Sequence, residues 1–181
     1  MKREFLTISN LLSIFRALLS IPFALVLLLP DPPLRLWAVV ILLVGVATDK
    51  LDGDLARRRG EETEWGRVLD PLADKVCVTV MALVLLRLGD LPMWFVAALI
   101  ARDALIFAGG VYVKSARGVV LPSNTVGKWT AGLIAFTIFV CLLGVLREMR
   151  WILLAGCAAG LLLSFVLYVG RFLHVARQAR V

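Results

Sequence analysis

Cysteine and histidine are scarce in this chain, which has three cysteines and one histidine in 181 residues. Cys77, Cys141 and Cys157 each fall inside a long apolar run, and their spacing fits neither a zinc site nor a disulfide pair. They are expected to be buried, inert thiols. His174 lies in a basic C-terminal tail and is expected to be solvated rather than catalytic. The chemistry of this protein must therefore be sought in other residue types.

Polar sequence is also in short supply. Hydrophobic residues make up 61% of the chain and the mean hydropathy is +0.92, whereas soluble domains are about 45–50% apolar. A membrane-spanning helix needs about 20 apolar residues. Six runs are long enough, at 11–29, 34–56, 69–88, 91–113, 128–146 and 151–172. The loops between them leave no room for a second soluble domain, so we predict one all-α domain of six transmembrane helices over residues 1–181.

Basic residues are divided unevenly between the two sides of the predicted membrane protein. Twelve lie on the side that holds both termini, and four lie on the other side. Cytoplasmic loops are enriched in Lys and Arg, so we predict cytoplasmic termini in the inner or plasma membrane of a bacterium. The net charge of +7 then reflects topology and anionic lipid rather than nucleic acid. The twelve are Lys2, Arg3, Arg57, Arg58, Arg59, Arg67, Lys114, Arg117, Lys128, Arg171, Arg177 and Arg180, and the four are Arg35, Arg87, Arg147 and Arg150.

The second predicted span ends in acidic residues, although charge at membrane depth is costly and usually functional. Asp49 and Asp52 share one helix face with Gly53 and Ala56, because their offsets are 0, 3, 4 and 7. Two carboxylates thus lie beside two positions with almost no side chain, which leaves space for a bulky nucleotide. Arg57 follows at the cytoplasmic end and can bind a phosphate with a fork of donors.

The third predicted span repeats this arrangement, with Gly66, Asp70 and Asp74 at i, i+4 and i+8. Four carboxylates cannot share a low-dielectric site without cations to neutralise them. Carboxylate oxygens suit Mg²⁺ or Mn²⁺, which commonly act beside substrate phosphates. Two such ions would clamp a phosphoryl group. We therefore predict a site for two divalent ions and a diphosphate at the cytoplasmic membrane surface.

Two other interpretations were weighed against this prediction. The acidic residues could form a solvated helix end with caps, and that is what we expect for Asp54, which points away from the shared face. They could also line the pathway of a divalent-cation transporter. Transporters often have two related halves, but nothing in the later spans mirrors this pattern, and Gly53, Ala56 and Arg57 would then have no role.

The spacing of these residues also carries a family resemblance. All eight positions match the signature of the CDP-alcohol phosphotransferases, so the chain resembles that family along its whole length. The resemblance implies a six-helix, homodimeric membrane enzyme that displaces CMP from a CDP-linked lipid with an acceptor hydroxyl. It implies that Asp49, Asp52 and Asp70 are metal ligands, and that Asp74 is a ligand, the general base, or both. It also implies contacts with the cytidine diphosphate by Asp52, Gly53, Ala56, Arg57 and Gly66.

The flanking segments are similar to two branches of this family, the phosphatidylglycerophosphate synthases and the CDP-dependent cardiolipin synthases. WGRVLDPLADK, residues 65–75, resembles both. The N-terminal segment resembles their Pro-Asn-x-Leu-Thr-x-x-Arg, with Ser9 in place of Pro and Ser13 in place of Thr, which implies nucleotide contacts by Asn10 and Arg16. Gly127-Lys128-Trp129-Thr130 is one residue shorter than the synthases' Gly-Lys-x-Lys-Thr and lacks its second lysine.

The expected reaction is metal-dependent transfer of a phosphatidyl group from CDP-diacylglycerol to sn-glycerol 3-phosphate. A dianionic acceptor needs cations beyond Arg57, and Arg102, Lys128 and Lys75 are the candidates. The alternative acceptor is phosphatidylglycerol, as in the cardiolipin synthases, which more often have Arg-Asp where this chain has Arg102-Asp103. The sequence predicts the reaction class and leaves the acceptor open between these two.

Overall fold

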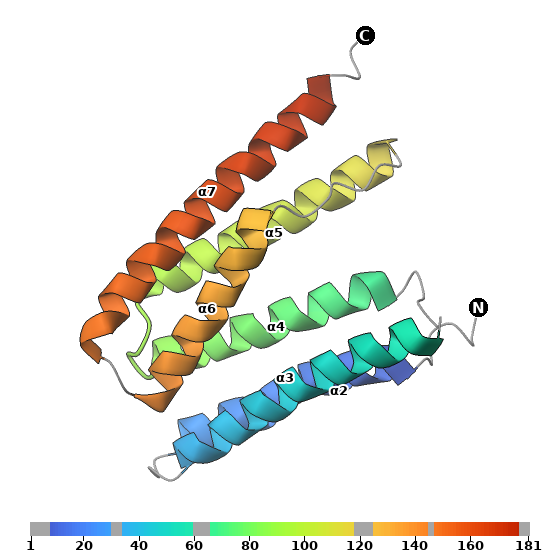
Figure 1. Ribbon diagram of the computed structural model, residues 1–181. Coiled ribbons are helices and arrows are strands. Elements are labelled where there is room, and N and C mark those ends of the chain that lie inside the picture. Colours follow the sequence, from blue (N-terminus) through green and yellow to red (C-terminus); the bar gives the residue numbers. More distant parts are fainter. Residues whose placement is uncertain (1–7, 30–33, 60–65, 118–124, 145–146, 178–181) are drawn as a thin grey trace. The chain divides into compact units, whose positions relative to one another are not determined.

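The computed structural model describes residues 8–29, 34–59, 66–117, 125–144 and 147–177, and side chains within 11–29, 35–48, 72–113, 115, 125–144 and 148–173. These residues are helical, joined by short turns, and contain no strand. Figure 1 shows the helices in chain order. They are α2 (Ile8–Leu28), α3 (Leu34–Arg59), α4 (Gly66–Arg87), α5 (Met93–Arg117), α6 (Thr125–Leu143), the 3₁₀ helix η1 (Arg147–Met149) and α7 (Arg150–Arg177).

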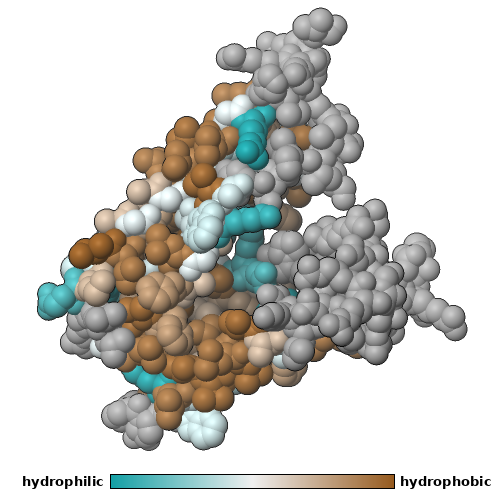
Figure 2. Space-filling model, viewed as in Figure 1, coloured by the Kyte–Doolittle hydropathy of each residue, from teal (hydrophilic) through white to brown (hydrophobic). Residues whose placement is uncertain are grey.

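Four of the described helices are long and apolar enough to cross a membrane. The qualifying segments are Leu11–Leu28, Met93–Val113, Thr125–Leu143 and Arg150–Leu173. Within the described part of α3 the apolar stretch is shorter, Arg35–Thr48. Large apolar side chains are exposed along the helices, and hydrophobic residues predominate among the residues that Figure 2 colours by hydropathy. In water such a surface would be an aggregation hazard, whereas in a bilayer it is the lipid-facing surface.

The contacts divide the chain into two compact units, residues 1–90 and 91–181. In the first unit α2 packs against both α3 and α4. Its buried positions recur every three or four residues, which makes one continuous helix face. Arg35, on the first turn of α3, donates to Asp90, just beyond α4, with Nη2 and Oδ2 3.1 Å apart. The start of α3 therefore lies beside the end of α4. The buried face of α2 comprises Ser13, Arg16, Ser20, Phe23 and Leu27.

In the second unit α7 packs against both α5 and α6. Arg102 of α5 bonds Ser164 of α7, and one turn later the Tyr168 hydroxyl donates to the carbonyl of Ile106 at 2.9 Å. Residue numbers rise together in these two contacts, so α5 and α7 run parallel. Gly160 approaches Thr130 and Cys157 contacts Thr137, so α6 runs antiparallel to α7. The three helices thus alternate in direction along the chain.

Glycines set two of the helix ends. After α4 the amide of Gly89 donates to the carbonyl of Leu86, and the amide of Asp90 donates to that of Leu85. Together with the φ of +78° at Gly89, this is the Schellman arrangement that ends a helix. Gly144, with a φ of +67°, likewise follows the end of α6. The fifth span was predicted to reach residue 146, and the helix stops three residues earlier because this left-handed position favours glycine.

Candidate active site

The signature residues lie on α3 and α4, within the first unit. Asp49, Asp52, Gly53, Ala56 and Arg57 all belong to α3, whose backbone is helical through Arg59. The helical conformation that the sequence analysis expected for this segment is therefore confirmed. Their side chains lie outside the described residues, as do those of Asp54 and Asn10.

Asp74 is the signature residue whose side chain the structure describes. It lies on the same helix as Gly66 and Asp70, whose side chains are outside the described residues. Arg16 Nη1 donates to Asp74 Oδ1 at 2.7 Å, and the two residues are 58 positions apart in the chain. The Arg16 side chain is only 7% exposed, whereas that of Asp74 is 53% exposed. The carboxylate thus pairs with a buried cation and still has an open side.

A second contact ties the same residues of α2 and α4 together. The thiol of Cys77 donates to the main-chain carbonyl of Arg16, with 3.2 Å between sulfur and oxygen. Cys77 lies one turn after Asp74, so the side chain and the main chain of Arg16 both contact one short stretch of α4. Ser13 and Ser20 on α2 and Ala73 on α4 are small residues and are buried. Small residues at a helix interface allow two backbones to approach closely.

The residues predicted to bind the acceptor differ in their surroundings. Lys75 is half-buried on α4, and Lys128 is exposed on the first turn of α6. Arg102 is 17% exposed within α5, and its Nη1 donates to Asp103 Oδ1 at 2.6 Å. Its Nη2 donates to the hydroxyl of Ser164 on α7. Among the described residues, the buried Arg102 Nε has no hydrogen-bond partner.

The donor set fits a hard divalent cation. Asp74 offers a partly exposed carboxylate, and the other signature aspartates lie within the helical segments α3 and α4. Oxygen donors of this kind are those that Mg²⁺ and Mn²⁺ prefer. Among the described side chains, which do not include those of Asp49, Asp52 and Asp70, no three metal-binding residues cluster together.

Fold and composition together define a helical integral membrane protein, and comparison with known proteins gives its family. Residues 6–167 match the CDP-alcohol phosphatidyltransferase family. The chain belongs to that family, whose members are membrane enzymes of phospholipid biosynthesis that act on CDP-alcohol substrates and generally use divalent metal ions. The family assignment decides for an enzyme and against a cation transporter.

Relatives from two branches of the family share substantial identity with the chain. A Mycobacterium tuberculosis protein named "Putative cardiolipin synthase" is 33% identical over 96% of this chain and 86% of its own length. An Escherichia coli protein named CDP-diacylglycerol–glycerol-3-phosphate 3-phosphatidyltransferase is 40% identical over 56% of this chain and 57% of its own length. A Streptomyces coelicolor protein named cardiolipin synthase (CMP-forming) is 38% identical over 56% of this chain and 48% of its own length. Both branches that the sequence analysis named are represented.

Proposed function

We propose that this protein transfers the phosphatidyl group of CDP-diacylglycerol to the hydroxyl of sn-glycerol 3-phosphate and releases CMP. One observation carries the proposal: a complete eight-position signature on α3 and α4, in a chain that matches the phosphatidyltransferase family over residues 6–167. The two compact units act as one domain in this proposal, because the family match runs through both.

Asp49, Asp52, Asp70 and Asp74 hold two divalent ions, Mg²⁺ or Mn²⁺, in this proposal. Bound there, such ions neutralise charge on the diphosphate and on the departing CMP. Asp74 receives the proton of the acceptor hydroxyl as its oxygen attacks the lipid-side phosphorus. The bond from that phosphorus to the oxygen of CMP breaks, and CMP carries the electron pair away. The partly exposed carboxylate of Asp74 supports this role, because a base must reach the proton that it takes.

The nucleotide half of the substrate lies along α3. Gly53, Ala56 and Gly66 leave room for the cytidine diphosphate against the helix backbones, and Asp52 and Asn10 contact it. Arg57 binds its phosphates, because the planar guanidinium can donate two parallel hydrogen bonds to phosphate oxygens.

Arg102 and Lys128 bind the acceptor in this proposal, and Lys75 remains a further candidate from the sequence. The guanidinium of Arg102 is held by Asp103 and Ser164, which supports a fixed orientation, and its buried Nε is the group left to donate. Phosphatidylglycerol is the second candidate acceptor. The name of the mycobacterial relative, which matches almost the whole chain, favours it.

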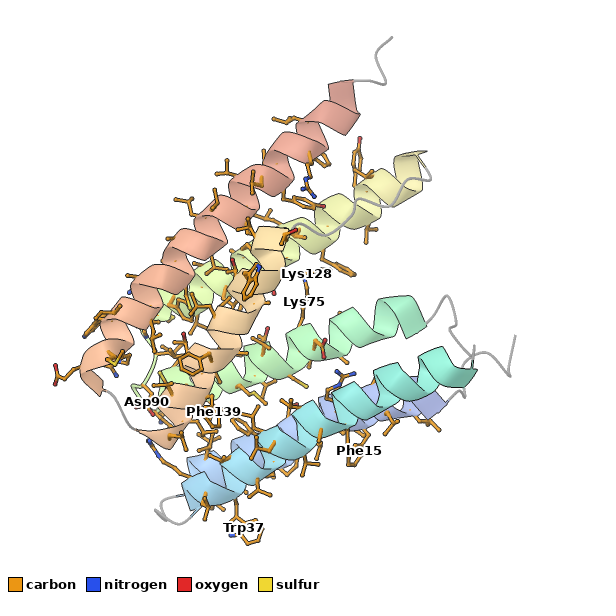
Figure 3. All side chains as sticks on the ribbon, viewed as in Figure 1. Phe15, Trp37, Lys75, Asp90, Lys128 and Phe139 are labelled. Carbon is orange, nitrogen blue, oxygen red and sulfur yellow. The ribbon has the colours of Figure 1, made fainter. Side chains whose placement is uncertain are left out.

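Six membrane crossings with cytoplasmic termini complete the proposal, in a homodimer in a bacterial inner or plasma membrane. The antiparallel course of α3 and α4, and the alternating directions of α5, α6 and α7, support six crossings. Exposed tryptophans at the first turns of α3, α5 and α7 support an interfacial position for each of those helix ends. They are Trp37, Trp94 and Trp151, and Figure 3 shows Trp37 pointing away from α3.

The test is an acceptor screen with the purified protein in detergent. CDP-diacylglycerol is incubated with Mg²⁺ and either glycerol 3-phosphate or phosphatidylglycerol, and CMP release is measured. Release with glycerol 3-phosphate supports the leading proposal, and release with phosphatidylglycerol alone replaces it by the second candidate. Asp52→Asn is the control for contaminating activity.

A further inference from the structure

A buried ion pair links the N-terminal helix to the proposed base. We infer that Arg16 is a positioning residue that orients the Asp74 carboxylate for phosphatidyl transfer, and that it does not bind the nucleotide as its sequence motif implies. The inference rests on the proposed function, because it assigns Arg16 to the residue proposed to take the acceptor's proton.

The Arg16 side chain is buried. A cation within an apolar helix bundle needs a partner, because an isolated buried charge is very unfavourable. Arg16 Nη1 has such a partner in Asp74 Oδ1 at 2.7 Å, and its side chain is 7% exposed. A guanidinium buried to this extent is poorly placed to meet a phosphate that arrives from the membrane surface. The phosphate-binding cation of the signature is Arg57, at the cytoplasmic end of α3.

The main chain of Arg16 is also held in place. Its carbonyl accepts the Cys77 thiol, one turn beyond Asp74 on α4. The neighbouring polar residues Ser13 and Ser20 are also buried, and the Ser20 hydroxyl donates to the carbonyl of Ala17 at 2.6 Å. Arg16 is thus attached to α4 through both its main chain and its side chain. A donor fixed in this way can set the direction of a carboxylate, which a long side chain on the surface could not.

The Asp74 side chain stays partly exposed although it is ion-paired. Arg16 donates to Oδ1, and the Asp74 side chain is still 53% exposed. The ion pair therefore restricts rotation of the carboxylate while leaving part of it accessible to the acceptor hydroxyl. Orientation of a base by a neighbouring group is a recurring device in catalysis, because misplacement of a reacting group slows the reaction more than it weakens binding.

The test separates positioning from nucleotide binding and from a structural role. In Arg16→Gln we expect kcat for CMP release to fall about ten- to a hundredfold, as for loss of one charge-assisted hydrogen bond. We expect the KM for CDP-diacylglycerol and the equilibrium affinity for CDP to stay within about threefold, because the nucleotide loses no contact. Arg16→Lys keeps the charge and should retain more of kcat than Arg16→Gln.

Arg35→Gln is the matched control. It breaks the other described Arg–Asp ion pair of the first unit, Arg35–Asp90, away from Asp74, and should leave kcat unchanged. Weakened CDP binding in Arg16→Gln with an unchanged kcat would overturn the inference in favour of a nucleotide contact. Equal losses of kcat and thermal stability in Arg16→Gln and Arg35→Gln would overturn it in favour of a structural role.

Two further outcomes are kept apart by the same experiment. If Arg16→Gln does not fold, Arg16→Lys decides, since a nucleotide contact would raise the KM for CDP-diacylglycerol and a positioning contact would lower kcat. Absence of turnover in the unmodified protein refutes the proposed function. If the unmodified protein turns over and Arg16→Gln keeps the same kcat, the positioning role of Arg16 is refuted and the proposed function stands.

Discussion

Substitution of Gly160 by alanine should destabilise the contact between α6 and α7. A Cβ atom at Gly160 would lie 2.7 Å from Thr130 Oγ1, 3.1 Å from its Cγ2 and 3.4 Å from its Cβ. Thr130 cannot easily move aside, because it is buried and its hydroxyl donates to the carbonyl of Val126 at 2.8 Å. Overpacking of this kind costs about 1–3 kcal/mol. The gain in helix propensity from glycine to alanine, about 1 kcal/mol, offsets part of that cost.

Gly170→Ala on the same helix is the control, because nothing lies within 4 Å of its added Cβ. The propensity gain is common to both variants, so the difference between them isolates the clash. In thermal unfolding in detergent, the Tm of Gly160→Ala should lie below that of Gly170→Ala. The expected difference is about 2–4 °C for each kcal/mol of lost stability. The double variant Gly160→Ala/Thr130→Ala should recover most of the loss, because the clashing atoms are removed. A Gly160→Ala protein as stable as Gly170→Ala would refute the reasoning.

Three further predictions concern topology, metal and acceptor. In sealed inside-out vesicles an impermeant maleimide should label Glu61→Cys and not Met149→Cys, since the three native cysteines are buried; the reverse pattern would invert the orientation. Chelation should abolish CMP release and Mg²⁺ or Mn²⁺ should restore it. Asp52→Asn should be inactive but folded. Asp54 lies about 200° from Asp52 around α3, so Asp54→Asn should keep most activity. Equal losses of activity in the two variants would contradict the helix face assigned to the site. Arg102→Ala and Lys128→Ala should raise the KM for glycerol 3-phosphate about ten- to a hundredfold, and an unchanged KM would remove them from the acceptor site.

Local features of the fold could be predicted from the sequence. Helical periodicity is a property of neighbouring residues, so the common face of Asp49, Asp52 and Gly53 follows from their spacing once the segment is helical. Long apolar runs likewise predicted the four helices that satisfy the length and hydropathy of a membrane span. The end of α6 was placed too late, because hydropathy alone does not register the left-handed backbone at Gly144.

Contacts between helices could not be predicted in the same way. Arg16 and Asp74 are 58 residues apart, and Arg102 and Ser164 are 62 apart. Which residues meet across a helix interface depends on rotation and register, which one sequence does not specify. Ser164 was missed for this reason. Its one signal was a hydroxyl inside an apolar span, where such groups commonly bond a neighbouring helix. The ion pair of Arg102 with Asp103 joins neighbours in the chain, so it does not depend on the register between helices.

Incorporation of labelled glycerol 3-phosphate into lipid tests the central claim most directly. Purified protein is mixed with CDP-diacylglycerol, Mg²⁺ and sn-glycerol 3-phosphate that carries a radiolabel, and the organic extract and released CMP are both counted. We predict that labelled lipid and CMP are formed in equal amounts. The Asp52→Asn variant should form neither product. Label that stays in the aqueous phase, while phosphatidylglycerol supports CMP release, would contradict the proposed acceptor. No CMP with either acceptor would contradict the proposed enzyme.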